Sequence, residues 1–306
     1  MASAVPSVSS SKEQLYPSFF ALCRRGQRAA QARASLPRVK AADFISVIAL
    51  DGRAQIGAYP VDARLAGDVR AYWSLTVVEP PARIRVVPDG QVDVVFDLDS
   101  GQAHFGGARD APLEAVHERP TRLLGATLLP GTAAAFLGVP ASVLGSDWQP
   151  LENVMGPVAQ QLASRLCAAE SLAARLVLLE TFLLARLVRS RTTDARVRRA
   201  LHEIDASHGR IDVARLGRES GASPRNLSRL FQEWVGMSPK RLARIVRVQA
   251  ALRRLAEPSP PTLAELAAET GFADQAHLAR ELRAVVGAPP SELAETFKHS
   301  SDPFKL

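Results

Sequence analysis

Cysteine is scarce in this chain of 306 residues, which has only Cys23 and Cys167. The two lie far apart in the sequence and form no CxxC pair, so neither a disulfide framework nor a thiolate zinc site is expected. Long apolar runs are missing as well, because the longest candidate, residues 176–188, is interrupted by charged residues. The apolar stretch at 18–23 is too short for the core of a secretory signal. We therefore expect a soluble, cytoplasmic protein with no membrane partner.

The sequence also lacks the usual signatures of catalysis. Its six histidines show no HxH or HExxH spacing, its serines form no GxSxG elbow, and neither a P-loop nor GxGxxG is present. Four aspartates stand between Asp89 and Asp99, but one belongs to a Pro-Asp-Gly turn and the other three fit the polar face of a strand. We therefore expect no enzyme activity, no cofactor and no bound metal.

Charge is unevenly divided along the chain. Residues 1–40 carry seven basic residues and one acidic residue, residues 41–190 carry 12 basic and 16 acidic, and residues 191–306 carry 19 basic and 14 acidic. The first segment has little hydrophobic period, so we expect a flexible basic extension, either solvated or in contact with a polyanion. The basic C-terminal third behind an acidic middle suggests that a polyanion binds the C-terminal region.

Residues 41–150 have the pattern of a β-rich domain. Four short segments are rich in β-branched or aromatic residues and are separated by Gly, Pro and Asp: FISVIAL (44–50), AYWSLTV (71–77), ARIRVV (82–87) and QVDVVFDL (91–98). In the last segment apolar residues alternate with Asp93 and Asp97, which is the period of a half-buried strand. We expect a sheet with one face in water.

The hydrophobic period becomes helical at about residues 151–190. Leu172, Leu176, Leu179 and Leu183 follow one another at spacings of four, three and four, which predicts an amphipathic helix. Such a seam either packs against the β-rich domain of its own chain or pairs with a second copy to form a homodimer through 151–190.

Residues 195–306 contain an internal repeat of one helical unit. Leu216 and Gly221 match Leu266 and Gly271 at an offset of 50, and after one inserted residue the match continues at an offset of 51. Oxygen-bearing residues mark four helix starts, namely Asp212, Ser223, Ser238 and the capping box Thr262 to Glu265. Gly221 and Gly271 stand where a sharp turn favours positive φ. Each unit therefore has the layout of a helix-turn-helix.

The second helix of each unit divides into an apolar and a polar face. The predicted buried residues are Leu227, Leu230, Phe231 and Trp234 in the first unit and Leu278, Leu282, Val285 and Val286 in the second. The predicted outward residues are Arg225, Asn226, Ser228, Arg229 and Gln232, and then Gln275, Ala276, Ala279, Arg280 and Arg283. Arg can donate two hydrogen bonds to guanine, and Asn or Gln can pair with adenine, so the outward faces suit a DNA major groove.

A basic helix joins the two units. Residues 238–257 are predicted to form one helix of roughly 25–30 Å, which suits two recognition helices placed about one turn of B-DNA apart. This helix contributes the candidate phosphate contacts Lys240, Arg241, Arg244 and Arg247. Further candidates for the DNA backbone are Arg283 and His277, the latter in a structural or backbone-contacting role.

The C-terminal residues resemble a known family. ASPRNLSRLFQEWVGMSPKRLARIVRVQAALRRL (222–255), followed by LAAETGFADQAHLARELRAVVGAPPSEL (266–293), resembles the DNA-binding region of AraC/XylS-type bacterial transcription regulators over about residues 195–295. The resemblance implies two helix-turn-helix units in adjacent major-groove segments. It implies base contacts from Arg225, Ser228 and Arg229 in the first unit and from Gln275, Ala279 and Arg280 in the second.

The second unit departs from the family pattern. Ala276 replaces a usual Ser, Leu278 and Leu282 replace two Phe, and Pro289 stands where a Thr normally caps the last helix. We expect these changes to loosen the second unit, and the small alanines to leave more of the base discrimination to the first unit.

The middle of the chain is similar to the N-terminal sensor-like domain of one subgroup of these regulators, through AYWSL (71–75), VVPDGQVDVVFDL (86–98), FGG (105–107) and the segment 128–151. That similarity implies a domain that binds an effector or dimerises, without naming the effector.

The expected fold class is α+β. We expect a flexible basic extension at 1–40, a β-rich regulatory domain at 41–190 that ends in helices, a double helix-turn-helix DNA-binding domain at 195–295 and a tail at 296–306. The predicted function is a one-component, nucleoid-associated transcription regulator, and the family resemblance implies an activator. Its expected partners are promoter DNA, RNA polymerase and a small-molecule effector. The alternative is a ligand-binding or metal-dependent cupin-like enzyme with a degenerate DNA-binding domain.

Overall fold

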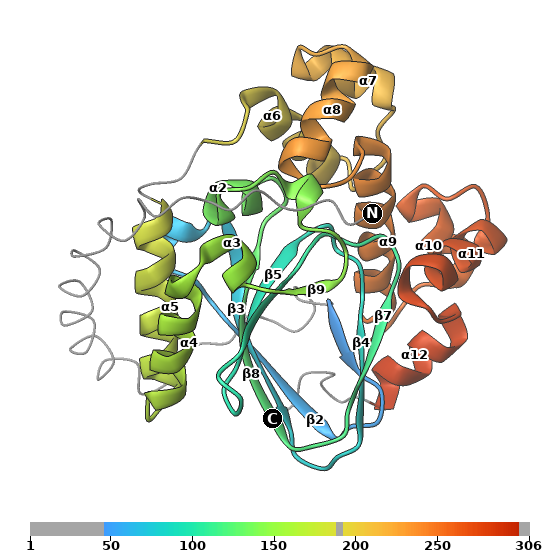
Figure 1. Cartoon of the computed structure of the whole chain (residues 1–306). Coiled ribbons are helices and arrows are strands. Elements are labelled where there is room, and N and C mark those ends of the chain that lie inside the picture. The colour runs from blue at the N-terminus through green and yellow to red at the C-terminus, as the bar shows by residue number, and fades with distance from the viewer. Residues whose placement is uncertain (1–45, 188–191, 300–306) are drawn as a thin grey trace, which may run out of the picture.

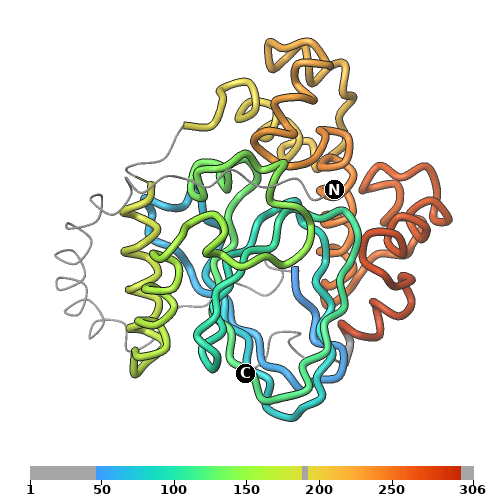
Figure 2. Tube along the Cα trace, in the orientation of Figure 1, coloured from blue at the N-terminus to red at the C-terminus, as the bar shows by residue number. Residues whose placement is uncertain are grey.

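A computed structural model describes residues 46–187 and 192–299 (Figures 1 and 2). The predicted extension at 1–40 and most of the predicted tail lie outside the described residues. The described chain begins with antiparallel strands and ends in helices, so the α+β class is confirmed. Among the described residues, none of the helices combines the length and the hydropathy that crossing a membrane would require.

Two antiparallel sheets form the first domain, and they face each other in Figure 1. The larger sheet has the order β2 (Ala54–Tyr59), β3 (Val69–Val77), β8 (Thr121–Leu128), β5 (Val92–Asp97), β6 (Ala103–Gly106) and β9 (Trp148–Pro150). The smaller sheet has the order β1 (Val47–Ala49), β4 (Ala82–Val86) and β7 (Leu113–His117). Strands β1, β3, β4 and β5 overlap the four strands predicted from the sequence.

The prediction of a sheet with one wet face is wrong, because both faces of β5 are covered. Val94 and Phe96 point into a core shared with helices, whereas Val95 packs between the two sheets. Asp93 and Asp97 line a cavity between the sheets. The predicted alternation of apolar and polar residues is present in β5. Its polar side, however, faces the cavity between the two sheets, where Trp73 and Thr127 donate hydrogen bonds to Asp93.

Helices cover the outer face of the larger sheet. They are α2 (Ala133–Leu137), α3 (Glu152–Met155), α4 (Pro157–Ala168) and α5 (Leu172–Leu187). In Figure 1, α4 and α5 stand side by side along this sheet. Leu176, Leu179 and Leu183 of α5 are buried in the core of their own chain. Of the two interpretations of the leucine seam, the structure therefore shows internal packing, and the seam offers no surface for a dimer.

Seven helices follow in the described part of the C-terminal region. They are α6 (Ala195–Ala206), α7 (Val213–Ser220), α8 (Pro224–Trp234), α9 (Pro239–Leu255), α10 (Leu263–Thr270), α11 (Gln275–Val286) and α12 (Pro290–His299). The predicted N-caps are confirmed, since Asp212, Ser223, Ser238 and Thr262 each accept a hydrogen bond from an amide of the first helical turn. The predicted capping box between Thr262 and Glu265 is present in both directions.

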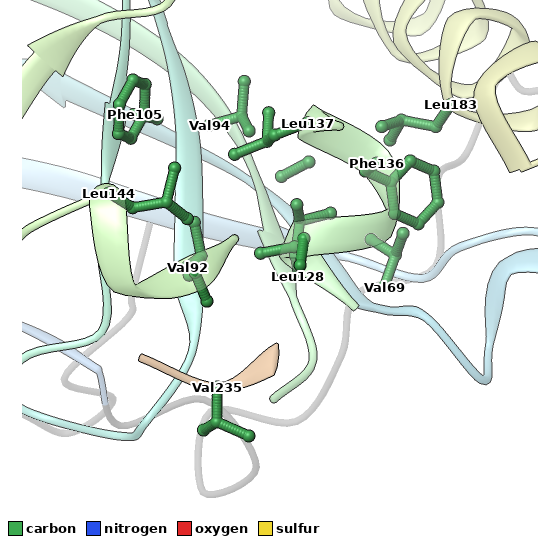
Figure 3. Close-up of a cluster of buried hydrophobic side chains, with 14 of the residues drawn as sticks. Val69, Val92, Val94, Phe105, Leu128, Phe136, Leu137, Leu144, Leu183 and Val235 are labelled. Atoms are coloured by element: carbon green, nitrogen blue, oxygen red, sulfur yellow. The ribbon is translucent and has the colours of Figure 1, made fainter. Parts of the chain in front are cut away.

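Helix α9 lies between two hydrophobic cores. Leu242 and Ile245, in its first half, belong to a core that contains the first unit and the helical face of the β-domain. Leu252 and Leu255, in its second half, belong to a core that contains the second unit together with Ile48 and Val87. Figure 3 shows part of the first core, in which Val235 follows α8 and lies near the side chains of the β-domain. Both units are therefore packed against the β-domain.

We expect Leu278→Ala to lower the free energy of unfolding by about 2–5 kcal/mol, because the fully buried side chain fills the second core. Chemical denaturation followed by circular dichroism measures the change. Val78→Ala is the control, since Val78 is 54% exposed and its truncation should change stability by less than about 0.5 kcal/mol. Equal losses in the two variants would show that the second core is loose.

Candidate nucleic-acid interface

Each repeated unit forms two helices joined by a tight turn. In the first unit α7 ends at Gly221 and α8 follows, and in the second α10 ends at Gly271 and α11 follows. The two glycines have φ of 73° and 74°, a left-handed conformation that costs a residue with Cβ about 1–2 kcal/mol. Asp274 caps α11 through its hydrogen bond from the His277 amide at 2.6 Å, a cap that the sequence analysis missed.

The predicted buried faces of α8 and α11 are confirmed. Their inward side chains are Leu227, Leu230, Phe231 and Trp234, and Leu278, Leu282, Val285 and Val286, all at most 5% exposed. The two leucines that replace family aromatics are thus fully buried, and they fill the core of the second unit.

The predicted base-reading residues lie on the opposite faces. Arg225, Arg229, Gln232, Gln275 and Arg280 are exposed, and Asn226, Ser228 and Ala279 are half-buried. The far end of the Arg229 side chain is held in place. Its guanidinium donates to Asn226 Oδ1 at 3.2 Å and lies 3.5 Å from Glu233. Such contacts between neighbouring turns restrict the side chain before any ligand arrives.

A groove of about 690 Å³ separates the two units. Five of the six predicted DNA-backbone residues line it, namely Lys240, Arg241, Arg244, Arg247 and His277. Arg283 does not line it and is exposed on α11. The structure thus gathers four basic residues of α9 and His277 of α11 on one concave surface between the two units, where Asp212 and Glu281 also lie.

Arg247 connects the two units through their turns. Its Nη2 donates to the Gly209 carbonyl at 2.8 Å, its Nη1 donates to the Gly271 carbonyl at 3.4 Å, and its guanidinium lies 5.7 Å from the Phe272 ring centroid. His277 packs edge-on against the same ring at 5.4 Å. The sequence analysis identified the charge of Arg247 but not this bracing contact, which joins residues far apart in the sequence.

Polar contacts join the basic domain to the β-domain. Arg241 forms an ion pair with Asp110 at 3.2 Å, and Gln249 Nε2 of α9 donates to the Pro88 carbonyl at 2.7 Å. Gly90, in the turn after Pro88, packs against the Leu242 side chain, and a Cβ there would lie 2.3 Å from Leu242 Cδ1.

Arg85 carries the most buried charge at this boundary, with 8% of its side chain exposed. Its Nη2 lies 2.7 Å from Glu114 on β7 and its Nη1 lies 3.4 Å from Glu292 on α12. The guanidinium thus bridges one carboxylate from each domain. No motif marks this residue in the sequence, where it looks like an ordinary outward residue of a strand.

The cavity between the two sheets has a volume of about 310 Å³. Its walls are apolar apart from Asp93, Asp97, His104 and His117, and they include the rings of Trp73 and Trp148. Within the described parts of the chain, no group of three or more His, Cys, Asp and Glu side chains is arranged to hold a metal ion.

Asp93 is the most perturbed acid of this cavity. Burial raises the pKa of Asp93 to about 7, and the neighbouring Asp89 carboxylate adds to the increase. Hydrogen bonds from Thr127 and from Trp73 Nε1, together with the charge of Arg109, act in the opposite direction. Burial also raises the pKa of Asp89, which accepts a hydrogen bond from Ser46.

The repeated helical units, their caps and the groove between them define the C-terminal region as a double helix-turn-helix domain. A family model described as a helix-turn-helix domain matches residues 216–296. The chain belongs to the AraC/XylS family of transcription regulators. A second model, a domain of unknown function (DUF6597), matches residues 58–147 of the β-domain.

Two relatives of the chain are named as regulatory proteins. The HTH-type transcriptional regulator GlxA of Rhizobium meliloti (strain 1021) is 30% identical over 198 residues, which cover 65% of this chain and 50% of GlxA. A probable thc operon regulatory protein of Rhodococcus erythropolis is 34% identical over 84 residues, 27% of this chain and 25% of the relative. The matched part of the chain therefore spans 50% of the length of GlxA and 25% of the length of the Rhodococcus relative.

A solved structure extends the comparison. A probable AraC family transcriptional regulator from Rhodopseudomonas palustris CGA009 is 31% identical to this chain, over 35% of this chain and 98% of the solved one, with a TM-score of 0.31.

Arg247→Ala should lower the free energy of unfolding by about 1.5–3 kcal/mol, because two carbonyl groups lose hydrogen bonds from a charged donor. Thermal and urea unfolding measure this loss. Arg218→Ala is the matched control, because Arg218 is exposed on α7 and its removal should change stability little. If the two variants are equally stable, Arg247 does not brace the units.

The pKa of Asp93 predicts a pH dependence of stability. The unfolded carboxyl titrates near 3.8 and the folded one near 7, so the folded protein binds the proton more tightly in this window. The free energy of unfolding should therefore fall as pH rises from about 4 to about 7. Urea denaturation at a series of pH values measures this slope. Asp93→Asn should flatten it, whereas the exposed control Asp205→Asn should not.

Proposed function

We propose that this protein is a sequence-specific DNA-binding transcription regulator whose β-domain responds to a small-molecule effector. The observation that carries the proposal is the repeated helix-turn-helix unit, which has polar recognition faces on α8 and α11 and, between the two units, a groove lined by four basic residues of α9. The family membership and the named regulators among the relatives support it. Such a role requires no chemical reaction, and we propose that the protein is not an enzyme.

The division of labour follows the predicted domains. We assign the effector response to 41–190 and DNA binding to 195–295, and the basic extension at 1–40 receives no role. The tail at 296–306 receives no role. RNA polymerase is the proposed protein partner, as expected for an activator.

DNA contacts are assigned by the position of each side chain. Arg225, Asn226, Ser228, Arg229 and Gln232 on α8, and Gln275, Ala279 and Arg280 on α11, read bases. Lys240, Arg241, Arg244, Arg247, His277 and Arg283 meet the DNA backbone. The α8 set is the more polar, so the first unit supplies more of the discrimination between bases.

Three of the backbone contacts are engaged inside the protein. Arg244 is paired with Glu281 at 2.6 Å, Arg241 with Asp110 at 3.2 Å, and Arg247 with two carbonyl groups. Lys240 is exposed at the start of α9 and lines the groove, so it is the clearest probe of a phosphate contact.

Arg229→Ala should weaken binding to the cognate promoter by about 1–3 kcal/mol and relax preference at one base pair, because it removes a base contact. Lys240→Ala should instead weaken binding to all sequences alike and reduce the salt slope by about one, because it removes a phosphate contact. Mobility-shift titrations on the protein's own upstream region and on random DNA, each at several salt concentrations, measure both effects.

Two results would contradict the proposal. Equal affinity of the unaltered protein for its upstream region and for random DNA at physiological salt would exclude sequence-specific binding. Identical behaviour of the Arg229 and Lys240 variants would exclude the assigned roles. Arg218→Ala, on the exposed face of α7, controls for the loss of a positive charge alone.

A further inference from the structure

We propose that the cavity between the two sheets binds a compact aromatic or apolar molecule that carries a protonated amine, with Asp93 as its counter-ion. The inference rests on the proposed function, because it names the chemical class of the effector. The cavity of about 310 Å³ has room for a ring of one or two cycles and a short side chain.

Two tryptophans shape the walls of this cavity, and glycines fix their positions. A Cβ at Gly125 would lie 2.3 Å from Trp73 Cε2, and a Cβ at Gly106 would lie 2.8 Å from Trp148 Cζ3. Only residues without a side chain permit the two indoles to lie against β8 and β6. The faces of tryptophan rings attract cations, and the attraction is stronger where the cation is desolvated.

The charges that line the cavity favour a cation. Two acids, Asp93 and Asp97, face it together with two histidines, His104 and His117, and burial lowers the pKa of His117, which disfavours its charged form. No Lys or Arg is among the described lining residues. Arg109 is outside the lining, where its Nη2 donates to the Ser146 carbonyl at 2.7 Å and its guanidinium lies 5.9 Å from the Trp148 ring centroid, and its positive charge only partly offsets the two acids, since the pKa of Asp93 remains raised. An anionic ligand would be desolvated beside two acids, which is unfavourable.

One oxygen of Asp93 is open to a ligand. The hydrogen bonds from Trp73 and Thr127 both go to Oδ1, and no described residue donates to Oδ2. A neutral apolar molecule would leave Oδ2 buried without a hydrogen-bond donor, which is unfavourable. An ammonium group supplies the missing donor and offsets the repulsion between Asp93 and Asp89.

Matched probes of one shape test the charge preference. Phenethylamine, 2-phenylethanol and 3-phenylpropanoate differ mainly in the charge of the polar end, and tryptamine extends the ring. Two of the three tryptophans of the chain line the cavity, so intrinsic fluorescence reports binding without DNA, and calorimetry measures the affinity. We expect the amine to bind at least about tenfold more tightly than the alcohol, which corresponds to about 1.4 kcal/mol, and the carboxylate to bind most weakly.

Asp93→Asn tests the counter-ion. Asn retains an oxygen that accepts from Trp73 and Thr127, so the fold should survive, as circular dichroism will show. The preference for the amine should vanish in this variant, should persist in the exposed control Asp205→Asn, and should weaken in Trp148→Leu.

The inference is overturned if the alcohol or the carboxylate binds as tightly as the amine, if no probe binds at millimolar concentration, or if Asp93→Asn keeps the preference. Because these titrations use the protein alone, their failure leaves the mobility-shift result untouched. Absence of specific DNA binding, in turn, would overturn the proposed function and leave the ligand affinities as measured.

Discussion

The packing of helix α9 between two cores is the constraint on which the rest of the structure depends. A helix-turn-helix unit is too small to bury much apolar surface alone, and two such units act together only if their separation is fixed. Helix α9 meets both requirements, because its first half completes one core and its second half completes the other. Its 17 residues span about 25 Å, so the recognition helices are held apart by a rigid element rather than by a linker.

The β-domain shares these cores instead of standing apart from them. The helical face of its larger sheet joins the first unit, whereas Ile48 of β1 in the smaller sheet and Val87, which follows β4, join the second. The turn at Asp89 contacts both the cavity and the basic domain. The Asp89 carboxylate raises the pKa of Asp93 at the cavity, whereas Pro88 and Gly90, on either side of Asp89, contact residues of α9. The cavity and the basic domain are therefore only one turn apart, which is the arrangement expected if occupancy of one is to influence the other.

Local features of the sequence predicted the C-terminal region well and the β-domain less well. Helix caps, turn glycines and apolar stripes are encoded within a few residues of one another, so α7 to α11 were predicted, together with the buried faces of α8 and α11. Strands β2, β6, β7, β8 and β9 were not identified from their period, because strand pairing depends on partners far away in the sequence. The carboxylates of β5 were assigned to water because alternation distinguishes two faces but not what covers each. Arg85 and Arg247 show the same limit, since their partners lie in other elements.

Arg85 has a partner in each domain, and this determines what separation of the domains would cost. A buried guanidinium that relied on Glu292 alone would lose its only counter-charge when α12 moved away, and stranding a buried charge is expensive. Glu114 belongs to the same sheet as Arg85 and stays with it, so the charge keeps a carboxylate whether the domains are joined or apart. Separation of the domains would therefore break the ion pair with Glu292, while the pair with Glu114 would remain and keep the guanidinium from being left without a counter-charge.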